Sequence, residues 1–155
     1  MLTDDQARDL GLRAVACEGW RLQEGILLRH LEQPSITLRV VGLDSDQEGF
    51  GWMLDESGGD DSGHMIEIKP RPILGQYAPD YRDGPTLGVL LSLVRGGHGM
   101  PCLHATHYWT GPGKEQWSVV DEGDRSDDAP RWRGPTEAEA LVAALEAAPG
   151  AGGEG

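Results

Sequence analysis

The chain of 155 residues is poor in cysteine, in positive charge and in long apolar segments. Its two cysteines, Cys17 and Cys102, lie far apart and form no Cys-x-x-Cys pair, which argues against a zinc ribbon or a redox motif. The longest apolar stretch, 87–94, is much shorter than the roughly 20 residues that cross a bilayer. The first residues lack the basic and apolar regions of a secretory signal. We therefore expect a cytoplasmic protein with reduced, partly buried thiols and no membrane association.

Positive charge is scarce. The 13 Lys and Arg residues stand against 26 Asp and Glu residues, which gives a formal net charge of −13. Binding to nucleic-acid phosphates needs concentrated Lys and Arg, so the composition disfavours direct contact with nucleic acid. A surplus of carboxylates is consistent with high solubility, with a basic protein partner, or with a surface that imitates nucleic acid.

The chain also lacks the signatures of common catalytic and phosphate-binding sites. No P-loop or dinucleotide-binding fingerprint occurs, and the glycines at 96–99 follow a predicted helix, whereas phosphate loops precede one. Ser62-Gly63-His64 is not a Gly-x-Ser-x-Gly nucleophile elbow. Neither cysteine carries a flanking nucleophile signature. We therefore assign no catalytic residue and expect no cofactor.

What is present is an alternation of helical and extended patterns. Helices are predicted from Thr3 to Gly19, from Gly84 to Gly96-Gly97, and from Gly134-Pro135-Thr136 to Ala148. Extended segments are predicted over Trp20–His30, Ile36–Leu43, Phe50–Leu54, His64–Lys69, Cys102–Trp109 and Gln116–Asp121, with a Pro- and Gly-rich connection over 70–83. Strands grouped between helices predict one α+β domain, residues 1–149, with a mostly antiparallel sheet and three helices. The Gly- and Ala-rich tail, 150–155, is predicted to be disordered.

Local signals support these elements. Thr3 and Gln6 have the spacing of a capping box at the start of the first helix. Gly11 is expected to weaken that helix by about 1 kcal/mol relative to Ala. Pro85 suits the first position of the second helix. In the segment 36–43, apolar residues alternate, which is typical of a strand with one buried face.

Two segments resemble a known family. Pro79-Asp80-Tyr81-Arg82-Asp83, followed by 86–95, and the helix over 137–145 are similar to segments of small phage and prophage proteins grouped as the phage ABA-sandwich domain family. The first helix through Trp20 is compatible with the same family. One departure is that Gly84-Pro85 follows Asp83, where the family tends towards Asp-Pro-Ala. The resemblance implies a three-layer α/β/α sandwich and an origin in a mobile element. It offers no catalytic residues to carry over.

Carboxylates gather in two stretches. The second, 121–128, is interrupted only by Arg125, and the first, 44–61, contains no Lys or Arg. Three interpretations of these stretches remain open: solvated loops, an interaction face for a basic protein, or calcium binding over 55–61, although an EF-hand would need fixed ligand spacing. We predict the interaction face of a phage or prophage accessory protein, such as an anti-CRISPR or other anti-defence inhibitor, docking on a basic host surface that normally holds nucleic acid. Its predicted partner-binding residues are Asp44, Asp46, Asp55, Glu56, Asp60 and Asp61.

Two alternatives of other classes use different residues. A protein that sequesters a nucleotide or another small molecule would use Arg82, His104 and Trp109 as ligand contacts. A metal-dependent enzyme would use Cys102, His104 and His107. On a strand, however, Cys102 and His104 share a face while His107 points to the opposite one. We therefore predict ordinary strand histidines beside a buried cysteine, and no metal site.

Overall fold

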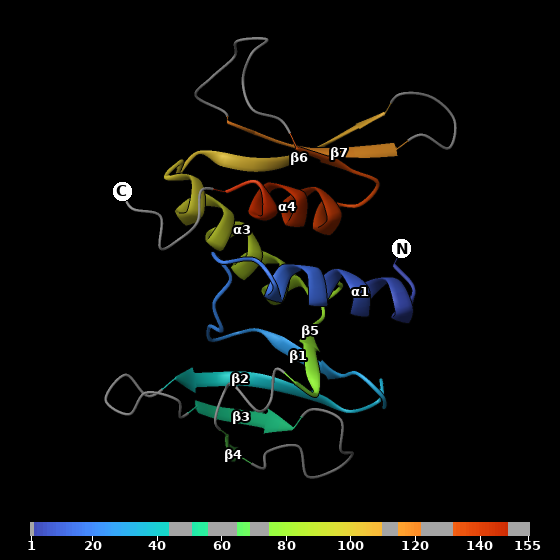
Figure 1. Ribbon diagram of the computed structural model, residues 1–155, viewed down its shortest axis with the longest axis vertical. Helices are drawn as coiled ribbons and strands as arrows, with labels where there is room; N and C mark the ends of the chain where they lie inside the picture. The colour runs from blue at the N-terminus through green and yellow to red at the C-terminus, as the bar shows by residue number, and fades with distance from the viewer. Residues whose placement is uncertain are drawn as a thin grey trace. The chain divides into compact units, whose positions relative to one another are not determined.

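The computed structural model describes residues 2–43, 51–55, 65–68, 75–109, 115–121 and 132–148. Over these residues the chain is α+β, with three helices and two antiparallel sheets (Figure 1). It groups into two compact units, which we describe separately. The five-stranded unit comprises residues 3–12 and 22–89, and the three-stranded unit comprises residues 1–2, 13–21 and 90–155. The single domain over 1–149 stays a prediction, and the tail 150–155 lies outside the described residues.

The five-stranded unit is a sheet in the order β4-β3-β2-β1-β5, in which all neighbours are antiparallel. Its strands are β1 (Leu27–His30), β2 (Thr37–Leu43), β3 (Gly51–Asp55), β4 (Met65–Ile68) and β5 (Tyr77–Pro79). The strand predicted over Trp20–His30 is too long, because Gly25 adopts φ 94° in a turn and β1 comprises only the last four residues of that range. The strand β5 lies in the segment predicted as a connection. In β2, Leu38 and Val40 are buried as the alternation predicts.

Helix α1 (Asp4–Val15) begins with the predicted capping box. The Gln6 N–H donates to Thr3 Oγ1 at 3.2 Å, and the Thr3 N–H donates to Gln6 Oε1 at 3.0 Å. Gly11 does more than weaken the helix. A Cβ built on it would lie 2.4 Å from the carbonyl oxygen of Pro79, so only glycine lets α1 lie this close to β5.

The three-stranded unit holds the order β6-β7-β8, again antiparallel, with helix α4 following it in sequence. The predicted hairpin is confirmed as β6 (Leu103–Trp109) and β7 (Glu115–Asp121), while β8 (Trp132–Gly134) was not predicted. The helix α4 (Glu137–Glu146) is capped by Thr136, whose Oγ1 accepts the Glu139 N–H at 3.2 Å. A single sheet was predicted, but strands before and after α3 form separate sheets.

Helix α3 (Gly84–His98) is longer than predicted. Gly96 and Gly97 remain helical, and the helix ends where Gly99 adopts φ 63°. The Gly99 N–H bonds the carbonyl of Gly96 and the Met100 N–H bonds that of Arg95, the two bonds of a Schellman cap. In the part of the chain that the structure describes, none of the helices is both long and apolar enough to cross a membrane.

Candidate functional site

The densest polar cluster of the five-stranded unit forms around the segment 79–83, which joins β5 to α3. Asp80 follows β5 directly, and its side chain is only 3% exposed. Its carboxylate accepts hydrogen bonds from two arginines. Arg29, on β1, donates from Nε at 2.7 Å, and Arg82 donates from Nε and Nη2 at 2.9 Å each and from its backbone N–H at 3.0 Å. A nearly buried charge is thus held by two guanidinium groups.

Each arginine of the cluster has a second anchor. Arg29 Nη1 donates to the carbonyl of Pro34. Arg82 Nη1 donates to Asp4, in the first turn of α1, at 2.7 Å. The cluster therefore fixes β1, the start of α1 and the end of β5 against one another.

The electrostatics of Asp80 follow from these contacts. Burial alone would raise the pKa of its carboxyl group, but the hydrogen bonds from Arg82 and Arg29 outweigh burial and hold the pKa below its ordinary value. The pKa of Arg82 is raised, chiefly by its hydrogen bonds with Asp80. Asp80 is therefore ionised at neutral pH.

A second pair lies three residues further along the chain. Asp83 binds Arg39 of β2 through two parallel hydrogen bonds of 3.0 Å, the geometry in which a guanidinium recognises a carboxylate best. Arg39 also donates to the carbonyl of Gly25 at 2.9 Å. Burial raises the pKa of Asp83, but bonds from Arg39 and Thr86 lower it further than burial raises it. This carboxylate is ionised as well.

Thr86 connects this pair to the sheet. Its side chain is fully buried in the first turn of α3. The hydroxyl donates to Asp83 Oδ2 at 2.7 Å and accepts the backbone N–H of Leu27 at 2.7 Å. The Asp83 carboxylate also accepts the Thr86 N–H at 3.1 Å, which makes Asp83 the cap of α3. One threonine therefore joins the start of β1 to the start of α3.

The chemistry available to this cluster is limited by its own bonds. A general acid must hold a proton near neutral pH, whereas Asp80 and Asp83 are kept ionised by their arginines. Asp80 accepts four hydrogen bonds and has little remaining capacity for a ligand. We therefore assign the cluster a structural role, which is to hold the elements of the five-stranded unit together.

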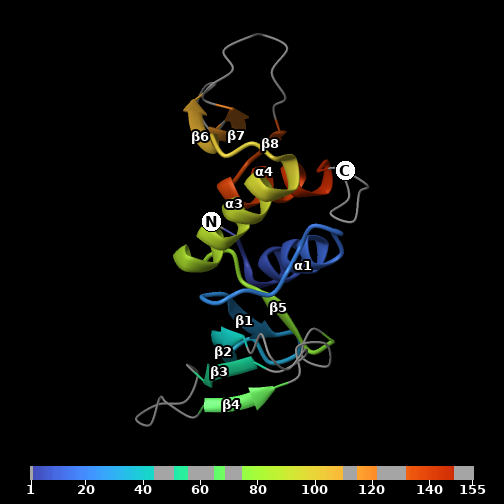
Figure 2. The ribbon, with the colours of Figure 1, turned by 90° about the vertical axis from the view of Figure 1, so that its left-hand side faces the viewer.

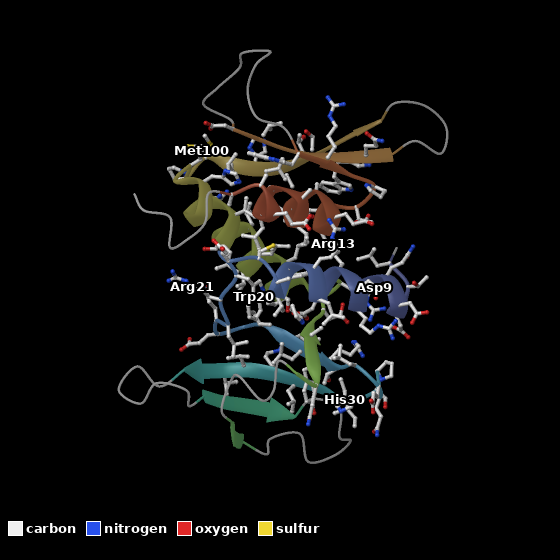
Figure 3. All side chains as sticks on the ribbon, in the orientation of Figure 1. Asp9, Arg13, Trp20, Arg21, His30 and Met100 are labelled. Carbon is white, nitrogen blue, oxygen red and sulfur yellow. The ribbon has the colours of Figure 1, made fainter. Side chains whose placement is uncertain are left out.

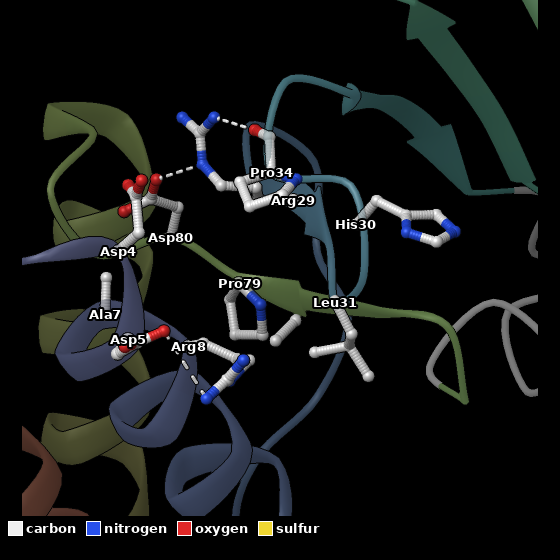
Figure 4. Close-up of a pocket in the computed structure, with 11 residues that line it drawn as sticks. Asp4, Asp5, Ala7, Arg8, Arg29, His30, Leu31, Pro34, Pro79 and Asp80 are labelled. Atoms are coloured by element: carbon white, nitrogen blue, oxygen red, sulfur yellow. Dashed lines mark hydrogen bonds and ion pairs between the residues drawn. The ribbon is translucent and has the colours of Figure 1, made fainter.

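A small pocket adjoins the cluster between the first turns of α1, the end of β1 and β5 (Figure 4). Its apolar wall comes from residues such as Ala7, Leu31 and Pro79, and its polar wall from Arg29 and Asp80. The volume is about 30 Å³, against roughly 10–15 Å³ for one water molecule. The pocket as it stands has room for about two waters, which is too little for a nucleotide.

The predicted acidic face lies almost entirely outside the described residues. This holds for Asp44, Asp46, Glu56, Asp60 and Asp61. Only the backbone of Asp55 is described, at the last position of β3 and opposite Leu38 of β2. The partner-binding role of all six residues stays a prediction.

The residues of the small-molecule alternative fall in different units. Arg82 belongs to the five-stranded unit and forms ion pairs with Asp80 and Asp4. His104 and Trp109 lie on β6 of the three-stranded unit, where His104 Nδ1 is 3.4 Å from the carbonyl oxygen of Cys102. The ligand-binding role of these three residues stays a prediction.

The candidate metal ligands do not assemble. The described residues contain no group of three or more His, Cys, Asp or Glu side chains that could hold a metal ion. Cys102 is exposed, which corrects the prediction of a buried cysteine, because it precedes β6 in a turn. His107 packs its ring against Trp117 of β7, with the ring centroids 5.0 Å apart. Cys17 is half-buried after α1, and burial raises the pKa of its thiol.

Ion pairs occur in the three-stranded unit too. Arg13, which is labelled in Figure 3, donates to Glu146 at the end of α4 at 2.5 Å. Both side chains are almost half exposed, so this pair contributes little to stability compared with those around Asp80.

Comparisons of the chain with protein-family models, with curated proteins and with solved structures give no match. The site is therefore interpreted from its own residues. Asp80, Arg82 and Asp83 lie in a segment with a family resemblance, but the sequence alone does not predict their ion pairs. The available signal was two acidic residues flanking an arginine directly before a helix start, with further arginines on predicted strands.

Proposed function

We propose that this protein acts by binding, and that its partner is a positively charged protein surface. The observation that carries the proposal is the excess of carboxylates over positively charged side chains, together with the pairing of arginines inside the chain. The chain has a net charge of −13, and several arginines of the described residues form ion pairs within the chain. In the described residues, the arginines that pair with carboxylates of the same chain are Arg8, Arg13, Arg29, Arg39 and Arg82.

This pairing of charges determines the electrostatic field around the protein. A paired guanidinium offers little positive charge to its surroundings, so the surplus carboxylates dominate the field around the protein. Such a field accelerates association with a basic surface and makes that association sensitive to salt. The stretch 44–61, which lacks Lys and Arg, is the proposed contact region.

The biological setting is part of the same proposal. A host defence complex that holds nucleic acid presents a basic surface of this kind, and an acidic phage or prophage protein in the cytoplasm could occupy it. The resemblance to phage ABA-sandwich proteins, with a three-layer α/β/α arrangement, supports this setting.

The test compares two variants with the same net charge. In the first, Asp55, Glu56, Asp60 and Asp61 are changed to Asn or Gln. In the second, the same change is made at four exposed carboxylates elsewhere: Asp9, Glu18, Glu24 and Glu32. Wild type and both variants are used to capture proteins from host lysate at low and high salt, and captured proteins are purified for binding kinetics.

We expect wild type and the second variant to bind the same basic partner at similar rates. The first variant should associate with that partner about tenfold more slowly than wild type does. Equal loss in both variants would show that net charge alone matters and would reject the contact region. A partner whose affinity is unchanged by salt would reject the electrostatic mechanism. Absorbance near 260 nm released on denaturing the purified protein would support the small-molecule alternative instead.

A further inference from the structure

The loop 31–36 joins β1 to β2 in the five-stranded unit, where β1 lies between β2 and β5 (Figure 2). Two backbone N–H groups of this loop are bonded by one side chain. The N–H of Glu32 donates to His30 Nδ1 at 3.1 Å, and the N–H of Gln33 donates to the same atom at 3.0 Å. Because a backbone N–H can only donate, Nδ1 carries no proton, and the neutral ring holds its proton on Nε2.

Two histidines of the three-stranded unit make contacts of the opposite polarity. His98 Nε2 lies 2.7 Å from the carbonyl oxygen of Ala144, and His104 Nδ1 lies 3.4 Å from that of Cys102. A carbonyl oxygen only accepts, so these ring nitrogens donate, and both contacts survive protonation of the ring. At His30, protonation converts the accepting nitrogen into a donor that faces two other donors. Both bonds to the loop are then lost.

The loop 31–36 also forms part of the pocket described above. His30, Leu31 and Pro34 lie on one wall of that pocket (Figure 4). A second side chain supports the loop, because Arg29 Nη1 donates to the carbonyl of Pro34 while Arg29 Nε bonds Asp80 at 2.7 Å. The position of the loop therefore determines the shape of this wall, and the His30 ring is one of the groups that fix that position.

The other ionisable groups around His30 belong to classes that titrate at different pH. Tyr77 of β5 packs edge-on against the ring, with the centroids 5.0 Å apart. The charged residues that line the pocket with His30 or belong to the loop are Asp4, Asp5, Arg8, Arg29, Glu32 and Asp80. Carboxylic acids ordinarily titrate at about pH 4, phenols at about pH 10 and guanidinium groups above about pH 12. Histidine is the side chain of this set that ordinarily changes charge between about pH 5 and about pH 8.

We propose that His30 is a pH-sensitive switch for the loop 31–36. The neutral ring holds two N–H groups of the loop, and protonation releases them, together with the pocket wall formed by Leu31 and Pro34. An asparagine or aspartate would provide a permanent acceptor, because these side chains commonly bond backbone groups two residues further on. Histidine provides an acceptor that is lost on mild acidification. The inference does not depend on the proposed function, because the loop lies outside the contact region 44–61.

The test is NMR spectroscopy of the full chain, labelled with nitrogen-15, between about pH 7.5 and about pH 5.5. At the higher pH, long-range proton–nitrogen spectra should show the His30 ring with its proton on Nε2. As the pH falls, the amide signals of Glu32 and Gln33 should shift with the same midpoint as the ring signals. Backbone order parameters over 31–36 should fall from roughly 0.85 to below about 0.6. A ring with its proton on Nδ1 at the higher pH would overturn the proposal.

Three variants separate the switch from a permanent structural contact. His30→Asn offers an oxygen acceptor that does not titrate, so its loop should stay ordered at both pH values. His30→Ala removes the acceptor, so its loop at the higher pH should resemble that of wild type at the lower pH. The matched control His104→Asn should leave the response of the loop unchanged. If His30→Ala fails to fold, wild type and His30→Asn still decide the question. Loss of order in His30→Asn at the lower pH, or constant order in wild type while the ring titrates, would overturn the proposal.

Discussion

Replacing Asp80 with Asn tests whether the buried cluster around it stabilises the fold. The carboxylate is 3% exposed and accepts four hydrogen bonds from Arg29 and Arg82. Removing one partner of a buried ion pair costs about 3–5 kcal/mol, because the remaining charge is left without compensation. Here the two arginine side chains are 30% and 24% exposed, and Arg82 keeps Asp4, so both recover some hydration. We therefore expect a loss near the lower end, about 3 kcal/mol.

The measurement is the free energy of urea unfolding at pH 7, with tryptophan fluorescence as the signal. A loss of about 3 kcal/mol lowers the melting temperature by roughly 6–12 °C in a chain of this length. The control is Asp5→Asn, because Asp5 is 84% exposed and its 3.6 Å pair with Arg8 should contribute less than about 0.5 kcal/mol. A double-mutant cycle with Arg82→Met then isolates the interaction between Asp80 and Arg82.

The pH dependence gives an independent check. The folded-state pKa of Asp80 lies below its unfolded value of about 3.9. The ionised carboxylate therefore stabilises the fold fully above that pH, and this contribution is lost as the pH falls through the folded-state pKa. The difference in unfolding free energy between wild type and Asp80→Asn should shrink below about pH 4. A difference under about 1 kcal/mol at pH 7, or one that stays constant down to pH 3, would refute the assigned role.

Other substitutions have opposite or graded outcomes. Gly11→Ala should destabilise the protein by about 1–3 kcal/mol, since its Cβ would lie 2.4 Å from a β5 carbonyl oxygen. Gly88→Ala, with nothing within 4 Å, should stabilise it by about 1 kcal/mol, and equal effects in melting experiments would contradict this. Thr86→Val should cost about 1–3 kcal/mol in urea unfolding while Thr86→Ser costs less, because only serine keeps the hydroxyl. Cys102, which is exposed, should react with a thiol reagent faster than Cys17, whose pKa burial raises, and faster labelling of Cys17 by mass spectrometry would contradict this.

Features determined by neighbouring residues could be predicted from the sequence. The capping box of Thr3 and Gln6 is present as predicted, and so is the hairpin of β6 and β7. Both depend on contacts within a helical turn or between adjacent strands. The predicted end of α3 is too early. Gly96, Gly97 and Gly99 are all glycines, and the sequence does not indicate that Gly99 is the one that adopts the left-handed conformation.

Features determined by distant residues could not be predicted. The strands β5 and β8 have three residues each, too few for an alternating pattern. The pairs of Asp80 with Arg29 and of Asp83 with Arg39 join positions 51 and 44 residues apart, and a single sequence does not indicate which arginine meets which carboxylate. The carboxylates of the stretch 44–61 are apparent in the sequence because they are numerous. Abundance is visible in a sequence, whereas pairing is not.

The cluster around Asp80 also constrains the order in which the chain can fold during synthesis. Its bonds, and that of Thr86, connect residues 44, 51, 59 and 78 positions apart. A nascent chain that has emerged only as far as β2 therefore exposes Arg29 and Arg39 before either has its carboxylate. Closing such long loops costs entropy before any contact forms. The five-stranded unit can therefore be completed only after the segment 79–86 has left the ribosome.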